Sequence, residues 1–96
     1  MFIISLTYLK PAEEIDALLA AHREYLREQY DNGIFLMSGR MVPRTGGVII
    51  ATADSRADIE AVIELDPFNE AGVASYAITE FVPTMTADIL SAFKQG

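Results

Sequence analysis

The chain contains a single histidine, His22, and its position carries the strongest chemical signal in the sequence. Residues 12–32 show the i, i+3, i+4, i+7 recurrence of apolar side chains that predicts an amphipathic helix, and His22 lies near the centre of the apolar stripe. A buried imidazole without a partner costs roughly 1 to 3 kcal/mol, so the ring must either find a hydrogen-bond partner or line a cavity. In a cavity, an imidazole can act as a general base near neutral pH. The inward positions of this predicted helix are Ile15, Leu18, Leu19, His22, Leu26 and Gln29, flanked by Tyr25 and Tyr30.

Asp66 is the candidate partner of this imidazole. It precedes Pro67, whose ring disfavours an α conformation at the residue before it and so holds Asp66 off the end of the preceding helix. A carboxylate that binds one imidazole nitrogen fixes the tautomer and leaves the other nitrogen free to move a proton. A structural interpretation stays open beside this one: Asp66 accepts backbone N–H bonds in a turn, Pro67 ends a helix, and His22 is a satisfied core residue.

Further side chains are candidates for binding a substrate. Ser38 and Arg40 lie on the same face of a predicted strand and offer a hydroxyl donor and a cation to an anionic or enolate-like ligand, although Arg40 is equally explained as a solvated charge. Tyr25, one turn beyond His22, either walls a pocket or belongs to the core. The candidate substrate contacts are therefore Ser38, Arg40, Tyr25, Pro67 and Phe68.

The elements that must position these residues follow the order βαββαβ, with a short C-terminal helix. This order predicts a ferredoxin-like α+β fold: a four-stranded antiparallel sheet with both main helices on one face, in a single domain over residues 1–96. Asn32 and Gly33 mark the end of the first helix, and Ser55 and Asp58 form the start signal of the second. Strands are expected at residues 1–8, 34–40, 48–53 and 73–82, helices at 12–32 and from 55 to before Pro67, and a loop at 68–72.

Three finer expectations concern the faces of these elements. In the first strand, Phe2, Ile4, Leu6 and Tyr8 alternate with Ile3, Ser5 and Thr7. In the second strand, the alternation predicts Ile34, Leu36, Ser38 and Arg40 on one face and Phe35, Met37 and Gly39 on the other. Near the C-terminus, Thr86 is expected to cap a helix that carries Ile89, Leu90 and Phe93 inward.

Composition narrows the class of partner. The 96 residues include 14 acidic and 7 basic ones, for a net charge of −7, and no Lys/Arg stripe marks a surface for nucleic acid or anionic membranes. An apolar fraction of 51% is high for so small a chain, so we expect a homodimer or a larger homo-oligomer that covers apolar surface.

Other classes of chemistry are disfavoured by what the sequence lacks. Without cysteine there is no disulfide, thiol chemistry or thiolate metal site, and one histidine makes no metal cluster, so we expect neither a metal nor a cofactor. No G-x-S-x-G, Walker or zinc pattern is present. No targeting segment or membrane span is evident, so a cytoplasmic location is expected.

The order and spacing of several motifs resemble the YciI-like family over nearly the whole chain. The motifs are His22-x-x-Tyr25-Leu26, Gly33-x-x-x-x-Ser38-Gly39, Pro43-Arg44-Thr45-Gly46-Gly47, and Asp66-Pro67-Phe68 followed by Gly72. The resemblance implies a dimeric ferredoxin-like domain, similar to muconolactone isomerase, whose active site is built around a His-Asp pair, here His22 and Asp66. One branch of the family removes chloride from chlorinated hydroxyquinols. The family's Ser-Gly segment is often followed by proline, where this chain has Arg40, so this side of the pocket differs.

Two functions follow from these observations. In the first, His22 oriented by Asp66 moves a proton on a small aromatic or unsaturated substrate, as a lyase of the dehydrochlorinase type or an isomerase. In the second, the same pocket holds a small molecule without turnover, in a binding or accessory domain. The fold alone does not decide between them, so the geometry around His22 has to.

Overall fold

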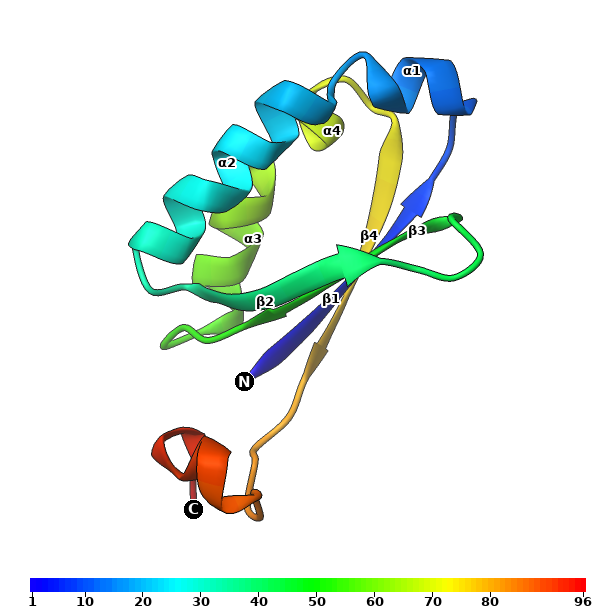
Figure 1. The fold of residues 1–96 in the computed structure, drawn as a ribbon. Coiled ribbons are helices and arrows are strands. Elements are labelled where there is room, and N and C mark those ends of the chain that lie inside the picture. Colours follow the sequence, from blue (N-terminus) through cyan, green and yellow to red (C-terminus); the bar gives the residue numbers. More distant parts are fainter.

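The computed structural model describes all 96 residues, and it contains a four-stranded antiparallel sheet with helices against one face (Figure 1). The strands are β1 (Phe2–Tyr8), β2 (Phe35–Arg40), β3 (Gly46–Ala51) and β4 (Ala74–Glu80), in the spatial order β2-β3-β1-β4. The helices are α1 (Ala12–Asp16), α2 (Leu19–Asp31), α3 (Arg56–Glu64), α4 (Pro67–Glu70) and the 3-10 helix η1 (Asp88–Phe93). This topology is ferredoxin-like, and the expected fold class is confirmed.

The core lies between the sheet and α2, α3 and α4. In β1 the inward residues Phe2, Ile4 and Leu6 are almost fully buried, and their neighbours Ile3 and Ser5 point to the open face of the sheet. Strand β1 pairs with both β3 and β4, so its inward side chains occupy the middle of the core. The period-2 alternation predicted for this strand is therefore present.

Strand β2 departs from the simple alternation expected of it. Phe35 pairs with Ala51 and Met37 with Ile50, so Leu36 is an extra residue in a β-bulge. The bulge places Phe35 on the same face as Ser38 and Arg40, where the alternation predicted the opposite face. Phe35 is buried there against the rings of Tyr25 and Tyr30, at centroid distances of 5.9 and 6.2 Å. The extra residue allows this aromatic cluster to form while Ser38 and Arg40 keep facing the helices.

The expected single helix over residues 12–32 is two helices. Leu18 N–H donates to the carbonyl of Ile15, and this tight i to i−3 turn separates α1 from α2. No proline or glycine marks the break, so residue types alone did not signal it. The end of α2 follows the expectation, because Gly33 adopts a φ of 75° just beyond it.

The segment after α3 was expected to be a loop, and it forms the short helix α4 instead. Asp66 is its N-cap, with Oδ1 accepting from Phe68 N–H at 3.0 Å, and Pro67 occupies the first helical position. The cap of α3 agrees with the sequence signal, since Ser55 accepts a hydrogen bond from Asp58 N–H. Proline thus ends one helix and starts another, with Asp66 fixed between the two.

The C-terminal segment does not pack inward as expected. It leaves β4 and runs away from the body of the molecule, and η1 makes no extensive contact with another element (Figure 1). Thr86 does not cap the helix, which follows Ala87, and Ile89 is 90% exposed. Met85, Ile89 and Leu90 are therefore exposed in the single chain, whereas Phe93 is half-buried.

Candidate active site

The imidazole of His22 and the carboxylate of Asp66 are in direct contact, from α2 and the α3–α4 junction. His22 Nδ1 lies 2.8 Å from Asp66 Oδ1, and the exposed fractions of the two side chains are 12% and 1%. Asp66 also accepts from Phe68 N–H on Oδ1 and, at 2.7 Å, from the hydroxyl of Tyr76 on Oδ2. With the carboxylate acting as acceptor in all of these bonds, Nδ1 of His22 carries the proton and donates it.

The second nitrogen of the ring, His22 Nε2, has no hydrogen-bond partner in the chain. It is not a buried orphan either, because every buried side-chain nitrogen and oxygen in the structure is hydrogen-bonded. His22 lines a cavity of about 160 Å³ between α2 and the sheet. In the neutral tautomer fixed by Asp66, Nε2 therefore presents a lone pair to a molecule in this cavity.

Phe68 holds the ring of His22 from one side. The two rings stack with centroids 3.9 Å apart and planes 7° from parallel, and Tyr8 meets Phe68 edge-on at 6.0 Å. Phe68 itself is 1% exposed, so it is a fixed surface rather than a mobile one. The imidazole is thus restrained by a hydrogen bond in its plane and by an aromatic ring on its face.

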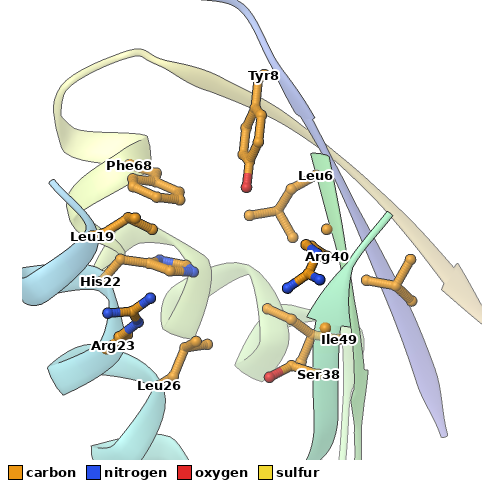
Figure 2. Close-up of a pocket in the computed structure, with 13 residues that line it drawn as sticks. Leu6, Tyr8, Leu19, His22, Arg23, Leu26, Ser38, Arg40, Ile49 and Phe68 are labelled. Carbon is orange, nitrogen blue, oxygen red and sulfur yellow. The ribbon is translucent and has the colours of Figure 1, made fainter. Parts of the chain in front are cut away.

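The walls of the cavity combine apolar and cationic side chains (Figure 2). Ser38 and Arg40 line it from β2, as the face assignment predicted, and Arg23 lines it from α2 beside His22. Ser38 Oγ shares a hydrogen bond with the hydroxyl of Tyr30, in which either group can donate. The apolar side chains that wall the cavity are Leu6, Tyr8, Leu19, Leu26, Ile49 and Phe68.

Two of the candidate substrate contacts do not reach this cavity. Tyr25 is 6% exposed, and its hydroxyl donates to the carbonyl of Val62, which anchors it in the core. Tyr25 and Pro67 line a separate surface depression instead. The structure therefore does not bring Tyr25 and Pro67 together with Ser38, Arg40 and Phe68 around the cavity beside His22.

Three residues of the site were missed from the sequence. Tyr76 binds Asp66, Tyr30 binds Ser38, and Arg23 lines the cavity. Tyr76 shares the inward face of β4 with Ala74 and Ile78, so an alternation analysis of this strand signals it. Arg23 carries no such signal, because it follows His22 directly and an exposed arginine on a helix is ordinary.

Burial changes the titration of two tyrosines in this region. Burial raises the pKa of the Tyr76 phenol well above its ordinary value, and its hydrogen bond to Asp66 raises it further. Burial also raises the pKa of Tyr25, with a smaller contribution from the negative charge of Asp66. Both phenols therefore stay protonated over the working range of the site, and the hydroxyl of Tyr76 stays a donor to Asp66.

The structure contains no group of three or more His, Cys, Asp or Glu side chains arranged to hold a metal ion. None of its helices combines the length and apolar character needed to cross a lipid bilayer. The polar groups of the cavity lining are the imidazole of His22, the hydroxyls of Ser38 and Tyr8, and the guanidinium groups of Arg23 and Arg40.

Fold and site together define a ferredoxin-like α+β domain with a His-Asp pair beside a small cavity. The YCII-related domain matches residues 1–82, so the chain belongs to the YCII-related family, as its motifs indicated. No curated protein matches the chain. Among solved structures, it is similar to 5-chloro-2-hydroxyhydroquinone dehydrochlorinase from Burkholderia phenoliruptrix AC1100, in a complex with 2,5-dihydroxybenzoquinone. The TM-score is 0.70 at 20% identity, over 84% of this chain and 93% of the other, a likeness that establishes the shared fold.

Proposed function

We propose that the protein is a small-molecule enzyme in which His22 Nε2 takes a proton from a substrate bound in the cavity. The observation that carries this proposal is the state of the imidazole: Nδ1 is held by a buried carboxylate, and Nε2 is unpartnered at the cavity wall. A histidine needed only for packing has no reason to leave one nitrogen facing an opening. A fixed tautomer with a free lone pair is what a general base requires.

The reaction we infer is an elimination or an isomerisation on a small aromatic or unsaturated compound. His22 Nε2 accepts the proton, and the electron pair of the broken bond forms a new π bond in the substrate. In the elimination, chloride leaves the adjacent carbon with its bonding electrons, so the substrate loses HCl overall. In the isomerisation, the proton returns from His22 to a different carbon and the composition is unchanged. The dehydrochlorinase that shares this fold supports the first form.

The lining residues fit the developing charge in such a reaction. Removing a proton leaves negative charge on a substrate oxygen, and Ser38 and Arg40 supply a hydroxyl and a cation on the wall formed by β2. Phe68 and the leucine side chains exclude water from the ring of the substrate. Asp66 stabilises the imidazolium that forms when His22 accepts the proton.

The test is turnover by the wild-type protein and by His22→Asn. The probes are 5-chloro-2-hydroxyhydroquinone, followed by chloride release, and a panel of small lactones, followed by NMR. Loss of the general base is expected to lower the rate by about 100-fold or more. Glu24→Gln changes an exposed residue of the same helix outside the cavity and is expected to keep the full rate. An active His22→Asn protein with an unchanged rate contradicts the role of His22.

The same geometry supports a second candidate, a binding domain without turnover. The observation in its favour is that Asp66 also caps α4 and holds Tyr76, so the pair has a structural use. His22→Leu separates the two. A folded variant that is at least as stable as the wild type points to a site kept for chemistry, whereas a loss of more than about 2 kcal/mol favours a structural role.

We also propose that the functional unit contains a second copy of the chain. The accessible surface is 6064 Å², against about 5,400 Å² expected for a folded chain of this mass. The radius of gyration of 13.8 Å also exceeds the value of about 12.5 Å for a compact chain of this length. The single chain leaves apolar side chains exposed in two places. These are the C-terminal segment and Met37, which is 56% exposed on the open sheet face. A copy packed against that face covers both.

A further inference from the structure

The charge of the cavity lining is opposite in sign to the charge of the whole chain. Acidic residues outnumber basic ones 14 to 7 in the sequence. The 13 residues that line the cavity nevertheless include Arg23 and Arg40 and no aspartate or glutamate. The carboxylate of Asp66 lies behind His22, is hydrogen-bonded on both oxygens, and does not line the cavity. A ligand in the cavity therefore meets cations first.

Neither of these arginines has an acidic partner. Of the other three arginines, Arg44 pairs with Asp16 at 2.6 Å and Arg56 pairs with Glu60 at 3.2 Å, whereas Arg27 has no ion pair. The Arg44–Asp16 pair lines an adjoining depression with Arg23 and Arg40, so Asp16 is already satisfied by Arg44. Arg23 extends from α2 and Arg40 from β2, and both guanidinium groups turn toward the cavity from opposite walls (Figure 2). Like charges at one opening repel each other, and an anion placed between them removes that repulsion. A planar guanidinium also suits an oxygen anion that spreads its charge over two atoms.

The size of the cavity limits what carries the anion. Its volume of about 160 Å³ is close to that of an apolar cavity of about 150 Å³ that accommodates benzene. The walls from Leu19, Leu26 and Phe68 suit the faces of one such ring. Substituents on the ring must then point along the open side, toward the arginines.

We propose that Arg23 and Arg40 form an anion-selecting rim, so that the substrate is a single planar ring bearing a delocalised oxygen anion. The anion is either a carboxylate substituent or an ionised ring oxygen, since both present the same chemistry to a guanidinium. In this arrangement Arg23 is a specificity-determining residue, next in sequence to the general base. The inference rests on the proposed function only in taking this cavity as the substrate site.

The experiment compares two probes that differ in charge and little else, benzoate and benzamide. Binding to the full-length protein is measured by amide chemical-shift titration at low salt. Benzoate is expected to bind at least about fivefold more tightly than benzamide, and added salt is expected to reduce this difference. Arg23→Gln and Arg40→Gln are each expected to weaken benzoate binding about three- to tenfold and to leave benzamide within about twofold. Arg27→Gln is the matched control, because it removes the same charge from α2 outside the cavity.

A second arm identifies the source of the anion. 4-Nitrophenol is titrated above and below its own pKa, so that the same molecule is presented as phenolate and as phenol. A preference for benzoate alone assigns the anion to a carboxylate, and a preference for the phenolate alone assigns it to a ring oxygen. Equal binding of charged and neutral probes, or anion binding untouched by both arginine substitutions, overturns the anion-selecting rim and leaves the cavity as a ligand site. If no probe shifts a resonance of a lining residue at its solubility limit, the anion-selecting rim fails, and the turnover measurements with His22→Asn decide the proposed function separately.

Discussion

The two faces of the sheet differ in what covers them, although the same strands supply both. On the face under the helices, Ile4 is fully buried and every buried polar side-chain atom is hydrogen-bonded. On the open face, Ile3 and Ile50 are only half-buried and Met37 is 56% exposed. The covered face is a packed core, and His22 lines a cavity within it. The open face resembles half of an interface, because its apolar side chains have no partner in the chain.

The proposed proton transfer takes place on the covered face. A proton-transfer site needs fixed groups and little water, and both come from the packing around Asp66 and Phe68 on the covered face. The open face lacks such restraint, since its strands present small hydroxyl and apolar side chains to solvent. Association between copies is the use that suits that surface. In our proposal, the covered face thus serves catalysis and the open face serves assembly.

The largest expected effect tests this division with two adjacent isoleucines. Ile4→Ala removes a fully buried side chain from the covered face and is expected to lower the free energy of unfolding by about 2 to 5 kcal/mol. Ile3→Ala changes the same residue type on the open face, where the loss in dilute protein is expected to stay below about 1 kcal/mol. Urea denaturation with fluorescence or circular dichroism measures both. Equal losses for the two variants would show that the faces are covered alike in a single chain.

A second prediction concerns pH and is specific to the covered face. Burial keeps the phenol of Tyr76 protonated in the folded protein at a pH where it ionises in the unfolded chain, near 10. The unfolded state therefore releases its proton first, and stability that is fully present below pH 10 declines as the pH rises further. Tyr76→Phe is expected to be less stable than the wild type at pH 8, by about 1 to 2 kcal/mol, because Asp66 loses a donor.

Above pH 10 the same variant is expected to lose stability more slowly than the wild type, by about 1.4 kcal/mol less per pH unit. Groups that titrate in both proteins cancel in this difference. Urea denaturation at several pH values between 8 and 11 measures it. Parallel curves for the two proteins would mean that Tyr76 ionises in the folded state as it does in the unfolded chain.

The elements of this fold were predictable where local sequence signals and tertiary packing agree. The alternation in β1, the Ser55 cap and the stop at Gly33 each follow from local chemistry, and each is present. The break between α1 and α2 carries no proline or glycine signal, and the bulge at Leu36 depends on packing against another element, which the residue types within the strand do not specify. Phe35, for example, is turned inward by its packing against Tyr25.

The candidate site, like the fold, could be predicted from the sequence only in part. His22 and Asp66 were individually visible as a polar residue on an apolar stripe and as a carboxylate fixed by proline, and the structure brings them to 2.8 Å. Tyr76 and Arg23 were not identified, since their significance depends on what lies opposite them. The prediction for the C-terminal segment was wrong for a related reason. Its apolar spacing predicted packing against the core, but the segment makes no extensive contact with another element of the chain.

The smallest expected effect on the unfolding of a single chain comes from the open face itself. Met37→Lys on this face and Leu65→Lys at the end of α3 replace side chains with similar exposed fractions, 56% and 59%. Neither change disturbs the core, so each is expected to alter the free energy of unfolding in dilute solution by no more than about 0.5 kcal/mol. Association separates the two variants, because only Met37 lies on the face assigned to the second copy. Met37→Lys is expected to raise the dissociation constant of the dimer at least about tenfold, whereas Leu65→Lys leaves it unchanged, as measured by sedimentation velocity over a concentration series. A wild-type chain that sediments as a monomer at every concentration, or a Met37→Lys dimer as tight as the wild type, removes the assembly role from this face and leaves its apolar side chains without a partner.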